Sequence, residues 1–544
     1  MAFNAADMFE HTADVVPDRI AIVCEDERRT YAELEARANA LAHHFATSGL
    51  EPGDHVGIYG LNSIQWVEAL LAVLKIRAVP VNINYRYVEE ELRYLFDNAD
   101  LKGLVYSQEF GPRVAAVVDQ LPMLETLVVI QDDSGADQAD LGPAVFEEVI
   151  AVNSSERDFA ERSGDDQIII YTGGTTGMPK GVMWRSEDIF FALAGGTDAF
   201  TGEKVKDEYQ HSETAKASEG QLVMMNTPPL MHGAAFVGTL MQFFQGNRNV
   251  LLPRFEAELV WRTIAREGIH SVLIVGDAMG RPLIEALEQL EADGEEIDLS
   301  SLLSLSSTAA VFSPTVKDGF LARFPNLVVT DSIGATESGF NGLITVSKDN
   351  TAMKGGGPTV KPGRDTVVLD DDLKPVEPGS GVIGKVARGG NIPLGYYKDE
   401  EKTKATWITA ADGQRYAMPG DFATVEADGT ITLLGRGSVC INTGGEKVFP
   451  EEVEQALKAH PDVFDAVVVG VTDDRWGQKV AAVVQARAGR VPALDDLDKH
   501  CRDYVAGYKV PRELHLVDEI VRSPSGKPDY PWAKNLAEAG TNRS

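Results

Sequence analysis

The chain has 544 residues, of which 44% are hydrophobic, and its formal net charge at pH 7 is −33. This length and apolar content can supply more than one core, since single domains rarely grow beyond a few hundred residues. The negative charge disfavours nucleic acid and anionic lipid as bulk partners, so an anionic ligand must bind in a local basic site.

The three cysteines are widely spaced and form no CxxC pair: Cys24, Cys440 and Cys501. This usage is typical of a reducing compartment and predicts no metal site. The N-terminal segment lacks a basic start followed by an apolar core, and no apolar run approaches the roughly 20 residues that span a bilayer. We therefore expect a cytoplasmic protein without a transmembrane segment.

The first half of the chain alternates helical and strand patterns. Apolar periodicity predicts a helix over 31–47, a strand over 55–59 and a helix over 64–75. This alternation predicts an α/β fold with a mostly parallel sheet covered by helices. Ligands of such sheets bind at the carboxyl ends of the strands.

An apolar run at 168–171 opens into a loop rich in glycine and threonine that ends in Lys180. Glycines allow close backbone approach, successive amides form an anion nest, and hydroxyls add further donors. These features predict a phosphate-binding loop. A Walker A loop is disfavoured, because Pro179 precedes the lysine and Gly181 stands where a Ser or Thr would hold magnesium.

The loop resembles the phosphate loop of the acyl-adenylate-forming enzymes, the superfamily of acyl-CoA synthetases, nonribosomal peptide adenylation domains and firefly luciferase. The resemblance implies that it binds the β- and γ-phosphates of ATP. The residues concerned are Thr172, Gly173, Gly174, Thr175, Thr176, Gly177 and Lys180. An ordinary glycine-rich strand-to-helix turn is the competing interpretation.

The polar segment 202–220 predicts a solvated surface loop or a lid. Four short apolar segments, each followed by a helix-like segment, predict further strands at 222–226, 271–275, 302–306 and 327–331. His232 precedes an apolar helix, and the family has a gate residue at this position. The helix amino end would favour the thiolate of CoA, although a simple helix-terminal histidine is the alternative. Small residues implied to leave room for a bulky acyl group are Gly233, Ala234, Ala235 and Gly276.

Residues 331–337 resemble the family's adenine and magnesium motif. There the hydroxyl of Thr336 would contact phosphate and the carboxylate of Glu337 would hold magnesium, a hard cation that prefers oxygen ligands. Ile333 replaces the usual aromatic residue against adenine, which substitutes aliphatic packing for stacking. Further nucleotide contacts are implied for Asp331, Ser332, Gly334, Ala309 and Ala310, with core packing as the alternative for the two alanines.

Turn signals at 378–381, 411–413 and 427–429 predict hairpins between residues 366 and 434. Within this region Asp421 resembles the ribose-binding carboxylate of the family, rather than an ordinary turn residue. Arg436 would reach ribose or phosphate as a fixed cation, against the alternative of a surface salt bridge.

The last part of the chain predicts a second domain with helices at 450–460 and 494–505 and strands at 465–471 and 479–486. The resemblance implies an AMP-binding domain over 1–434, a hinge at 435–438 and a small mobile α+β lid domain over 439–544. Ser438 occupies the hinge position, where the family usually has Asp or Lys, so a charge-based latch is in doubt.

Lys527 follows Ser523-Pro524-Ser525-Gly526 and resembles the family's adenylation lysine. Its ammonium would lie between the substrate carboxylate and the α-phosphate and would stabilise transition-state charge. The implied catalytic set is Lys527, Glu337, Thr336 and His232. The implied CoA contacts are Gly444, Gly445, Trp476, Lys509 and Arg512.

The sequence therefore predicts an ATP- and Mg²⁺-dependent acyl-CoA synthetase that forms acyl-AMP and then transfers the acyl group to CoA. Taken over the whole chain, its motifs are most similar to those of actinobacterial fatty-acid and steroid-side-chain CoA ligases. This similarity favours a bulky apolar acid, with a medium- or long-chain fatty acid as the alternative. An adenylating module that loads a carrier protein, a luciferase-like oxygenase and a non-enzymatic binding protein are the other classes, and a homodimer is an assembly to test.

Overall fold

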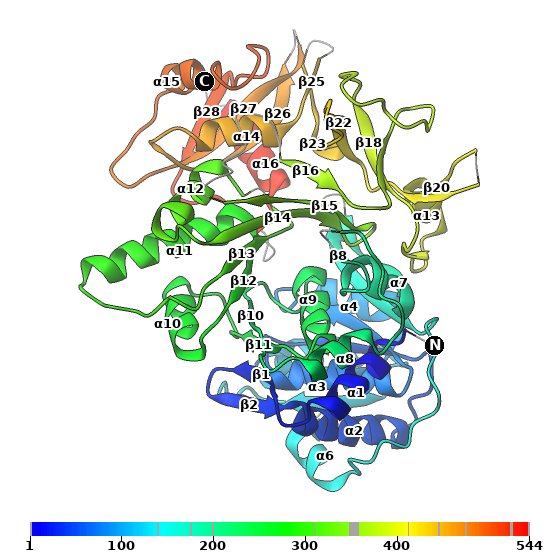
Figure 1. Ribbon diagram of the computed structural model, residues 1–544. Coiled ribbons are helices and arrows are strands. Elements are labelled where there is room, and N and C mark those ends of the chain that lie inside the picture. Colours follow the sequence, from blue (N-terminus) through cyan, green and yellow to red (C-terminus); the bar gives the residue numbers. More distant parts are fainter. Residues whose placement is uncertain are drawn as a thin grey trace. The chain divides into compact units, whose positions relative to one another are not determined.

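The computed structural model describes residues 3–138, 141–174, 177–198, 201–310, 312–347, 358–411, 413–443, 446–473, 476–522 and 526–541. The chain, drawn in Figure 1, divides into two compact units. The first unit comprises Met1–Leu273, Leu290–Leu303 and Gly390–Trp407, and the second comprises Ile274–Gln289, Ser304–Gly389 and Ile408–Ser544. The boundary expected at residues 434 and 435 remains a prediction.

The first unit contains an eight-stranded sheet in the order β19–β9–β8–β4–β3–β5–β6–β7. Its strands are β3 (His55–Tyr59), β4 (Val79–Ile83), β5 (Leu101–Ser107), β6 (Thr126–Ile130), β7 (Ala144–Val145), β8 (Gln167–Gly174), β9 (Gly177–Arg185) and β19 (Gly395–Tyr396). The strands from β8 to β7 pair in parallel, whereas β9 pairs antiparallel with β8 and with β19. The α/β class is confirmed.

A second group of paired strands in the first unit, mostly parallel, has the order β2–β1–β11–β10–β12. It consists of β1 (Ile20–Cys24), β2 (Glu27–Thr30), β10 (Val223–Asn226), β11 (Arg248–Leu251) and β12 (Ser271–Ile274), with β2 antiparallel at its edge. The helices of this unit are α1 (Ala5–Val15), α2 (Tyr31–Thr47), α3 (Ile64–Lys75), α4 (Glu89–Asn98), η1 (Gln108–Phe110), α5 (Gly111–Val118), α6 (Phe146–Val152), α7 (Ser186–Leu193), α8 (Gln210–Ala217), α9 (Gly233–Phe244), α10 (Ala257–Glu267) and α13 (Glu400–Thr406).

Local capping explains why two predicted helices begin where they do. The Thr30 hydroxyl accepts from the Glu33 amide while the Glu33 carboxylate accepts from the Thr30 amide, which forms a capping box at the start of α2. At the start of α3 the Ser63 hydroxyl accepts from the Trp66 amide at 3.0 Å. The predicted bounds of α2, β3 and α3 are confirmed to the residue.

The segment 202–220 is more ordered than a solvated loop, because it contains α8. Ala215 of this helix is buried. Tyr209, just before the helix, stacks on the ring of His11 from α1 at 4.2 Å. The helix is short and polar, and its sequence carries no strong apolar period, which is why the pattern predicted a loop.

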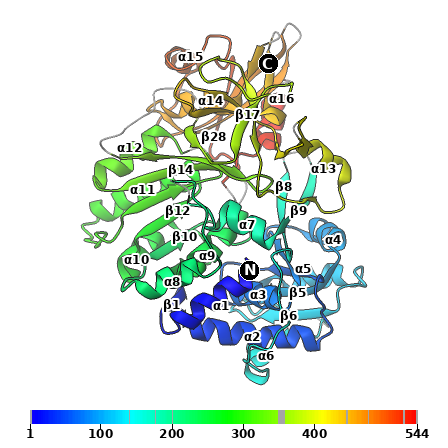
Figure 2. The same ribbon diagram turned by 45° about the vertical axis from the view of Figure 1, so that its right-hand side comes forward.

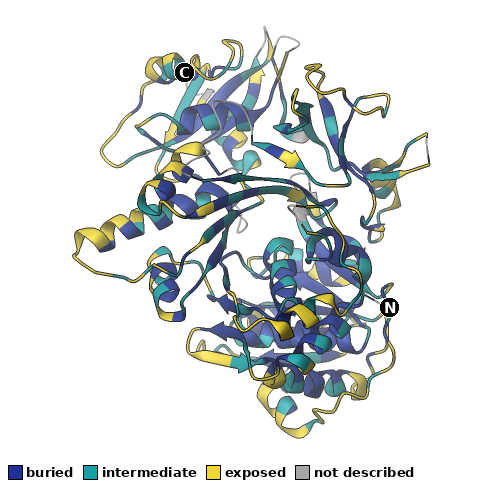
Figure 3. Ribbon diagram, in the orientation of Figure 1, coloured by how far each residue is buried: buried dark blue, intermediate teal, exposed yellow. Residues whose placement is uncertain are grey.

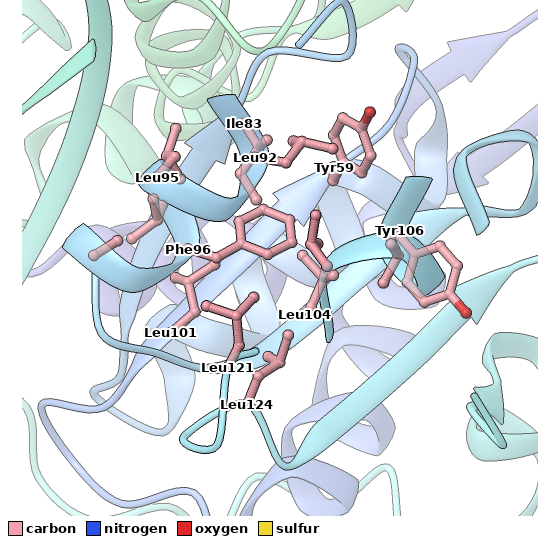
Figure 4. Close-up of a cluster of buried hydrophobic side chains, with 14 of the residues drawn as sticks. Tyr59, Ile83, Leu92, Leu95, Phe96, Leu101, Leu104, Tyr106, Leu121 and Leu124 are labelled. Atoms are coloured by element: carbon pink, nitrogen blue, oxygen red, sulfur yellow. The ribbon is translucent and has the colours of Figure 1, made fainter. Parts of the chain in front are cut away.

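The core beside the eight-stranded sheet is formed by aliphatic and aromatic side chains under α4 and α5. Phe96 of α4 lies among Leu92, Leu101, Leu104 and Leu121 (Figure 4). Figure 3 shows the central strands of this unit as mostly buried and the outer faces of several helices as exposed, while the edge strand β2 is partly exposed. The sheet that carries the predicted phosphate loop is thus held by a packed apolar layer.

A buried ionic cluster joins α1, α2 and α3. Lys75, at the end of α3, has no exposed side-chain surface, and its ammonium lies 2.5 Å from a Glu10 oxygen and 2.8 Å from both Glu35 oxygens. Arg157 donates to Glu35 at 2.9 Å, and Arg162 donates to Glu10. Lys75 and the two arginines therefore compensate the buried negative charges of these carboxylates.

In the second unit, β13 (Ser304–Ser307) pairs in parallel with β14 (Val328–Ala335), and the sheet then becomes antiparallel. The antiparallel strands are β15 (Gly339–Val346), β16 (Thr359–Pro362), β17 (Thr366–Leu369), β18 (Gly384–Arg388), β20 (Trp407–Thr409), β21 (Arg415–Ala417), β22 (Asp421–Val425) and β23 (Ile431–Arg436). The helices beside it are α11 (Gly276–Ala292) and α12 (Pro314–Arg323).

The helix expected after residues 327–331 is wrong, because β14 turns directly into β15. Gly339 at this turn has φ of +80°, and a Cβ on Gly334 would lie 2.5 Å from the Gly339 carbonyl oxygen. Only glycine fits both positions, so the backbone can fold back tightly. The hairpin expected at 427–429 is confirmed: the Glu426 amide donates to the Thr430 carbonyl at 2.8 Å.

Residues 441–541 form a separate five-stranded sheet in the order β25–β24–β27–β26, with β28 paired to β27. Its strands are β24 (Ile441–Thr443), β25 (Glu446–Val448), β26 (Val463–Asp473), β27 (Gly477–Ala486) and β28 (Glu513–Val517). The helices of this part are α14 (Pro450–Lys458), α15 (Leu494–Cys501) and α16 (Tyr530–Thr541), and the short helix η2 (Gly437–Val439) precedes it. The expected helix over 494–505 ends at Cys501 and continues only as turns.

We expect Lys75→Met to lower the free energy of unfolding by about 3–5 kcal/mol, because it leaves Glu10 and Glu35 buried with too little compensating charge. Urea denaturation measures the change. Lys102→Met is the control, since Lys102 pairs with Asp54 but is 38% exposed, and we expect a loss below about 1 kcal/mol. Equal losses in the two variants would contradict the importance of the buried cluster.

Candidate active site

The predicted phosphate loop follows β8 and continues into β9, two antiparallel strands of the first unit. Strands β8 and β9 lie side by side, with Thr172 opposite Lys180 and Gly174 opposite Gly177 (Figure 2). The alternative of a strand-to-helix turn is therefore wrong. Thr175 and Thr176 lie outside the described residues, as do the side chains of 173–177, so the phosphate contacts expected of them remain predictions.

Asn82 holds strand β8 just before the phosphate loop and was not singled out from the sequence. Its side chain accepts from the Tyr171 amide at 2.7 Å and donates to the Tyr171 carbonyl at 3.1 Å. The same amide group donates to the carbonyl of Met231, which precedes His232. Asn82 thus ties the phosphate-loop strand to the turn that leads into α9. A lone Asn in the buried strand β4 carries no sequence motif that would have revealed this role.

His232 is the residue that caps the amino end of α9, with φ of −105° and ψ of 138°. Gly233 begins the helix, and Ala235 is completely buried. Gly276 belongs to the second unit and begins α11. The acyl-pocket assignment of these residues therefore stays a prediction.

Lys180, the cation at the end of the loop, donates to the carboxylate of Asp399. Its ammonium also lies 5.5 Å from the centre of the Tyr396 ring. Asp399 is the N-cap of α13, which lies far along the chain from the loop and carries no phosphate-binding motif. The sequence therefore gave no reason to connect it with Lys180.

In the second unit, the first residue of the motif 331–337, Asp331, belongs to a buried ion pair. The ammonium of Lys317 lies 2.7 Å from Asp331 Oδ2, and both side chains are nearly completely buried. Burial raises the pKa of Asp331, and Lys317 opposes that rise. Asp331 thus has a structural ion-pair partner, and its predicted contact with adenine remains a prediction.

The residues after Asp331 line up along β14. Ser332 donates from its hydroxyl to the Ser307 carbonyl at 3.1 Å, and Ile333 packs against a hydrophobic cluster that includes Val360. Ala309, after β13, is exposed and has φ of +66°. Core packing, the alternative interpretation of this position, is therefore wrong for Ala309, while Ala310 is half-buried.

Four predicted residues from separate segments of the second unit form one charged cluster. Arg436 donates from Nε to Asp421 Oδ1 at 3.1 Å, and the two residues are register partners on β23 and β22. The charge of Asp421 raises the pKa of Arg436, with a further contribution from Glu337. The cluster thus contains both the predicted ribose carboxylate and the predicted magnesium carboxylate.

Lys527 completes this cluster. Its side chain stays accessible to solvent, yet many protein atoms surround it, and desolvation lowers its pKa. The nearby charge of Arg436 lowers the pKa further, whereas Glu337 and Asp421 act in the opposite direction. Two cations and two carboxylates are therefore close enough to influence one another.

The backbone before Lys527 is held by an arginine that sequence reasoning missed. Arg522 donates to the Gly526 carbonyl at 2.8 Å and to both oxygens of Asp465 at 2.7 and 2.8 Å. Although burial acts to raise the pKa of Asp465, Lys458 and Arg522 lower it. Ser523, Pro524 and Ser525 lie outside the described residues.

The predicted CoA contacts separate into two kinds. Trp476 is 37% exposed, and the Arg512 guanidinium lies 5.9 Å from the centre of its ring. Lys509 instead donates to the nearly buried carboxylate of Glu452 at 2.6 Å. Gly444 and Gly445 lie outside the described residues, and so does the side chain of Ser438.

Two family models match the chain. The model of the AMP-binding enzyme matches residues 9–397, and the model of the AMP-binding enzyme C-terminal domain matches residues 452–527. Within the described part of the chain, no helix is long and apolar enough to cross a membrane.

Several curated relatives match nearly the whole chain. The medium/long-chain-fatty-acid–CoA/3-oxocholest-4-en-26-oate–CoA ligase of Mycobacterium tuberculosis is 54% identical over 539 residues, which are 99% of this chain and 97% of that protein. The 3-oxocholest-4-en-26-oate–CoA ligase of Rhodococcus rhodochrous is 52% identical and covers 98% of this chain and 96% of its own length.

Among solved structures, the anthranilate CoA ligase AuaEII in complex with anthranoyl-AMP has a TM-score of 0.83 at 23% identity. The match covers 99% of this chain and 98% of that one, and it supports a common fold. The predicted resemblance is confirmed by the family models, the relatives and this fold. The chain belongs to the AMP-binding enzyme family.

Proposed function

We propose that this chain is an AMP-forming acid–CoA ligase that activates a carboxylic acid as acyl-AMP and then transfers the acyl group to CoA. The observation that carries the proposal is the cluster of Lys527, Arg436, Glu337 and Asp421, which the fold assembles from four separate segments. Family membership and the activities for which the two relatives are named support the same conclusion.

The first half-reaction must bring two anions together, because a carboxylate attacks the α-phosphate of ATP. Positively charged groups that are already in place lower this barrier without reorganising during the reaction. Lys527 would stabilise the charge that develops between the carboxylate and the phosphate, and Lys180 would receive the outer phosphates. Asp421 would accept from the ribose hydroxyls, with Arg436 beside it as a fixed cation.

Glu337 of this cluster and its chain neighbour Thr336 carry oxygen ligands of the kind that fits Mg²⁺. Glu337 supplies a carboxylate and Thr336 a hydroxyl, and Mg²⁺ usually binds through one or two carboxylates together with substrate phosphates. The described residues contain no cluster of three acidic, histidine or cysteine side chains that would make an all-protein cage. Glu337 and Thr336 would hold the ion, which would neutralise phosphate charge when bound.

For the second half-reaction, we propose that residues 439–544 act as a lid domain that turns about a hinge at 435–438. Gly444 and Gly445 would line the path of the CoA thiol, with Trp476 and Arg512 at its nucleotide. Lys509 is a weaker candidate, because its ammonium is paired with Glu452. The remaining alternative is a module that loads a carrier protein, which shares the adenylation step but not the acceptor.

The proposed acid is a steroid with a carboxylated side chain of the 3-oxocholest-4-en-26-oate type, and medium- and long-chain fatty acids are proposed as further substrates. The relative that is 54% identical is named for both kinds of acid, the steroid acid and the fatty acids. His232, Gly233, Ala235 and Gly276 are the residues proposed to shape the acyl site. Small side chains at these positions would leave room for a ring system, which is why a steroid acid is proposed first.

We expect a substrate panel to give thioester with free CoA from both the steroid acid and a long-chain fatty acid, compared as kcat/KM. A short-chain acid should react at least ten times more slowly, since it buries less apolar surface. A phosphopantetheinyl carrier protein, offered in place of CoA, is the control for the alternative acceptor. Transfer to the carrier but not to CoA would contradict the proposed ligase.

Lys527→Ala should lower the rate of acyl-AMP formation by about two to three orders of magnitude, because a preorganised charged contact is lost. Thioester formation from supplied acyl-AMP should be largely preserved. ATP–pyrophosphate exchange and single-turnover transfer measure the two steps separately. Lys534→Ala is the control, since Lys534 lies on α16 and is 47% exposed. A similar loss in both half-reactions would show that Lys527 acts structurally.

The lowered pKa of Lys527 predicts that exchange activity declines at alkaline pH. The cation is the active form, so activity is lost as pH rises through its pKa, which lies below the usual 10.5. Glu337→Gln removes a carboxylate that raises this pKa, and we expect its alkaline midpoint to move to lower pH. Lys527→Arg should lack the decline. The measurement is the normalised pH profile, and identical profiles in all three proteins would refute the assignment.

A further inference from the structure

The phosphate-loop lysine is engaged by an anion of the protein itself. The ammonium of Lys180 donates to the Asp399 carboxylate and lies over the Tyr396 ring, so both contacts come from one short segment. The two side chains of the ion pair are 36% and 30% exposed, which leaves the ammonium within reach of solvent and of a soluble ligand.

The segment that carries Asp399 is fastened to the phosphate-loop strand. Strand β19 pairs antiparallel with β9, and the Tyr397 amide donates to the Gly181 carbonyl at 2.8 Å. Asp100 anchors the segment from the other side, because it accepts from the Tyr397 hydroxyl and from Lys398, each at 2.7 Å. Asp399 therefore has a fixed position beside the root of the loop.

The two oxygens of Asp399 have different tasks. Oδ1 accepts from the Lys402 amide at 2.9 Å and caps α13, whereas Oδ2 accepts from Lys180. The hydrogen bond from Lys180 lowers the pKa of Asp399, so the carboxylate is charged at neutral pH. An asparagine is as good a helix cap as aspartate but has no charge, which makes the two tasks separable by mutation.

We propose that Asp399 is a positioning residue that holds Lys180 as an internal counter-anion and competes with the triphosphate of ATP for it. The inference rests on the proposed function, in which Lys180 receives the outer phosphates. Binding of ATP or pyrophosphate to Lys180 must break the ion pair. The free energy of the ion pair therefore reduces the affinity for each of the two ligands. When pyrophosphate leaves, Lys180 pairs with Asp399 again, and this ion pair favours product release.

The test is the affinity of Asp399→Asn for ATP and for magnesium pyrophosphate, measured by calorimetry. We expect both ligands to bind about two- to fivefold more tightly, which corresponds to the worth of a partly exposed ion pair. Pyrophosphate release should slow by a similar factor. Glu400→Gln is the matched control: it removes one negative charge from the next residue of α13, whose side chain is 92% exposed, and should leave both affinities unchanged.

A double-mutant cycle separates competition from a structural effect. In a Lys180→Gln background, Asp399→Asn should no longer change either affinity. Weaker or unchanged ATP binding in the single variant, or an equal change in both backgrounds, would overturn the inference. Nucleotide affinity is measured without acid or CoA, so this failure is distinct from failure of the proposed function, which would appear as absence of acyl-CoA formation by the wild-type chain.

Discussion

The proposed chemistry depends on positive charge at the phosphates of ATP, in a chain whose net charge is −33. Long-range attraction cannot supply it, because the summed field of the protein repels polyanions. The charge must come from single lysines and arginines at short range. In both units these cations lie beside carboxylates: Lys180 beside Asp399, and Arg436 beside Asp421.

This pairing has two consequences of opposite sign. A carboxylate neighbour keeps a cation protonated and fixes its direction, as the influence of Glu337 and Asp421 on the pKa of Lys527 illustrates. The same neighbour weakens the attraction for an incoming phosphate. An enzyme that must release pyrophosphate and AMP in each cycle gains from moderate binding of both, since tight binding of ground states does not accelerate turnover.

The buried ion pairs of the second unit act differently from the accessible ones. Lys317 with Asp331, and Arg522 with Asp465, are screened little by solvent, and each belongs to a segment that carries a predicted nucleotide contact. Arg522 connects Asp465 at the start of β26 with the backbone just before Lys527. Removing one partner of such a pair leaves a buried charge, so these residues secure the geometry on which the cations depend.

The sequence by itself determined the elements with strong local signals. The capped, periodic helices α2 and α3 and the apolar strand β3 have their predicted bounds, because a capping box and a 3.6-residue period are properties of neighbouring residues. The motifs around Lys180, Glu337, Asp421 and Lys527 likewise identified the family, since their order along the chain is a sequence property. Four of the predicted residues do share a cluster in the second unit.

Tertiary structure alone decided which side chains meet across long separations. Asp399 lies 219 residues from Lys180, and Arg522 lies 57 residues from Asp465. Neither pair leaves a pattern among neighbouring residues of the sequence. The turn of β14 into β15 was missed for a related reason: it depends on the close approach of the Gly334 and Gly339 backbones. Periodicity reports which face of an element is apolar, whereas the partner of a charge is set by the fold that brings distant segments together.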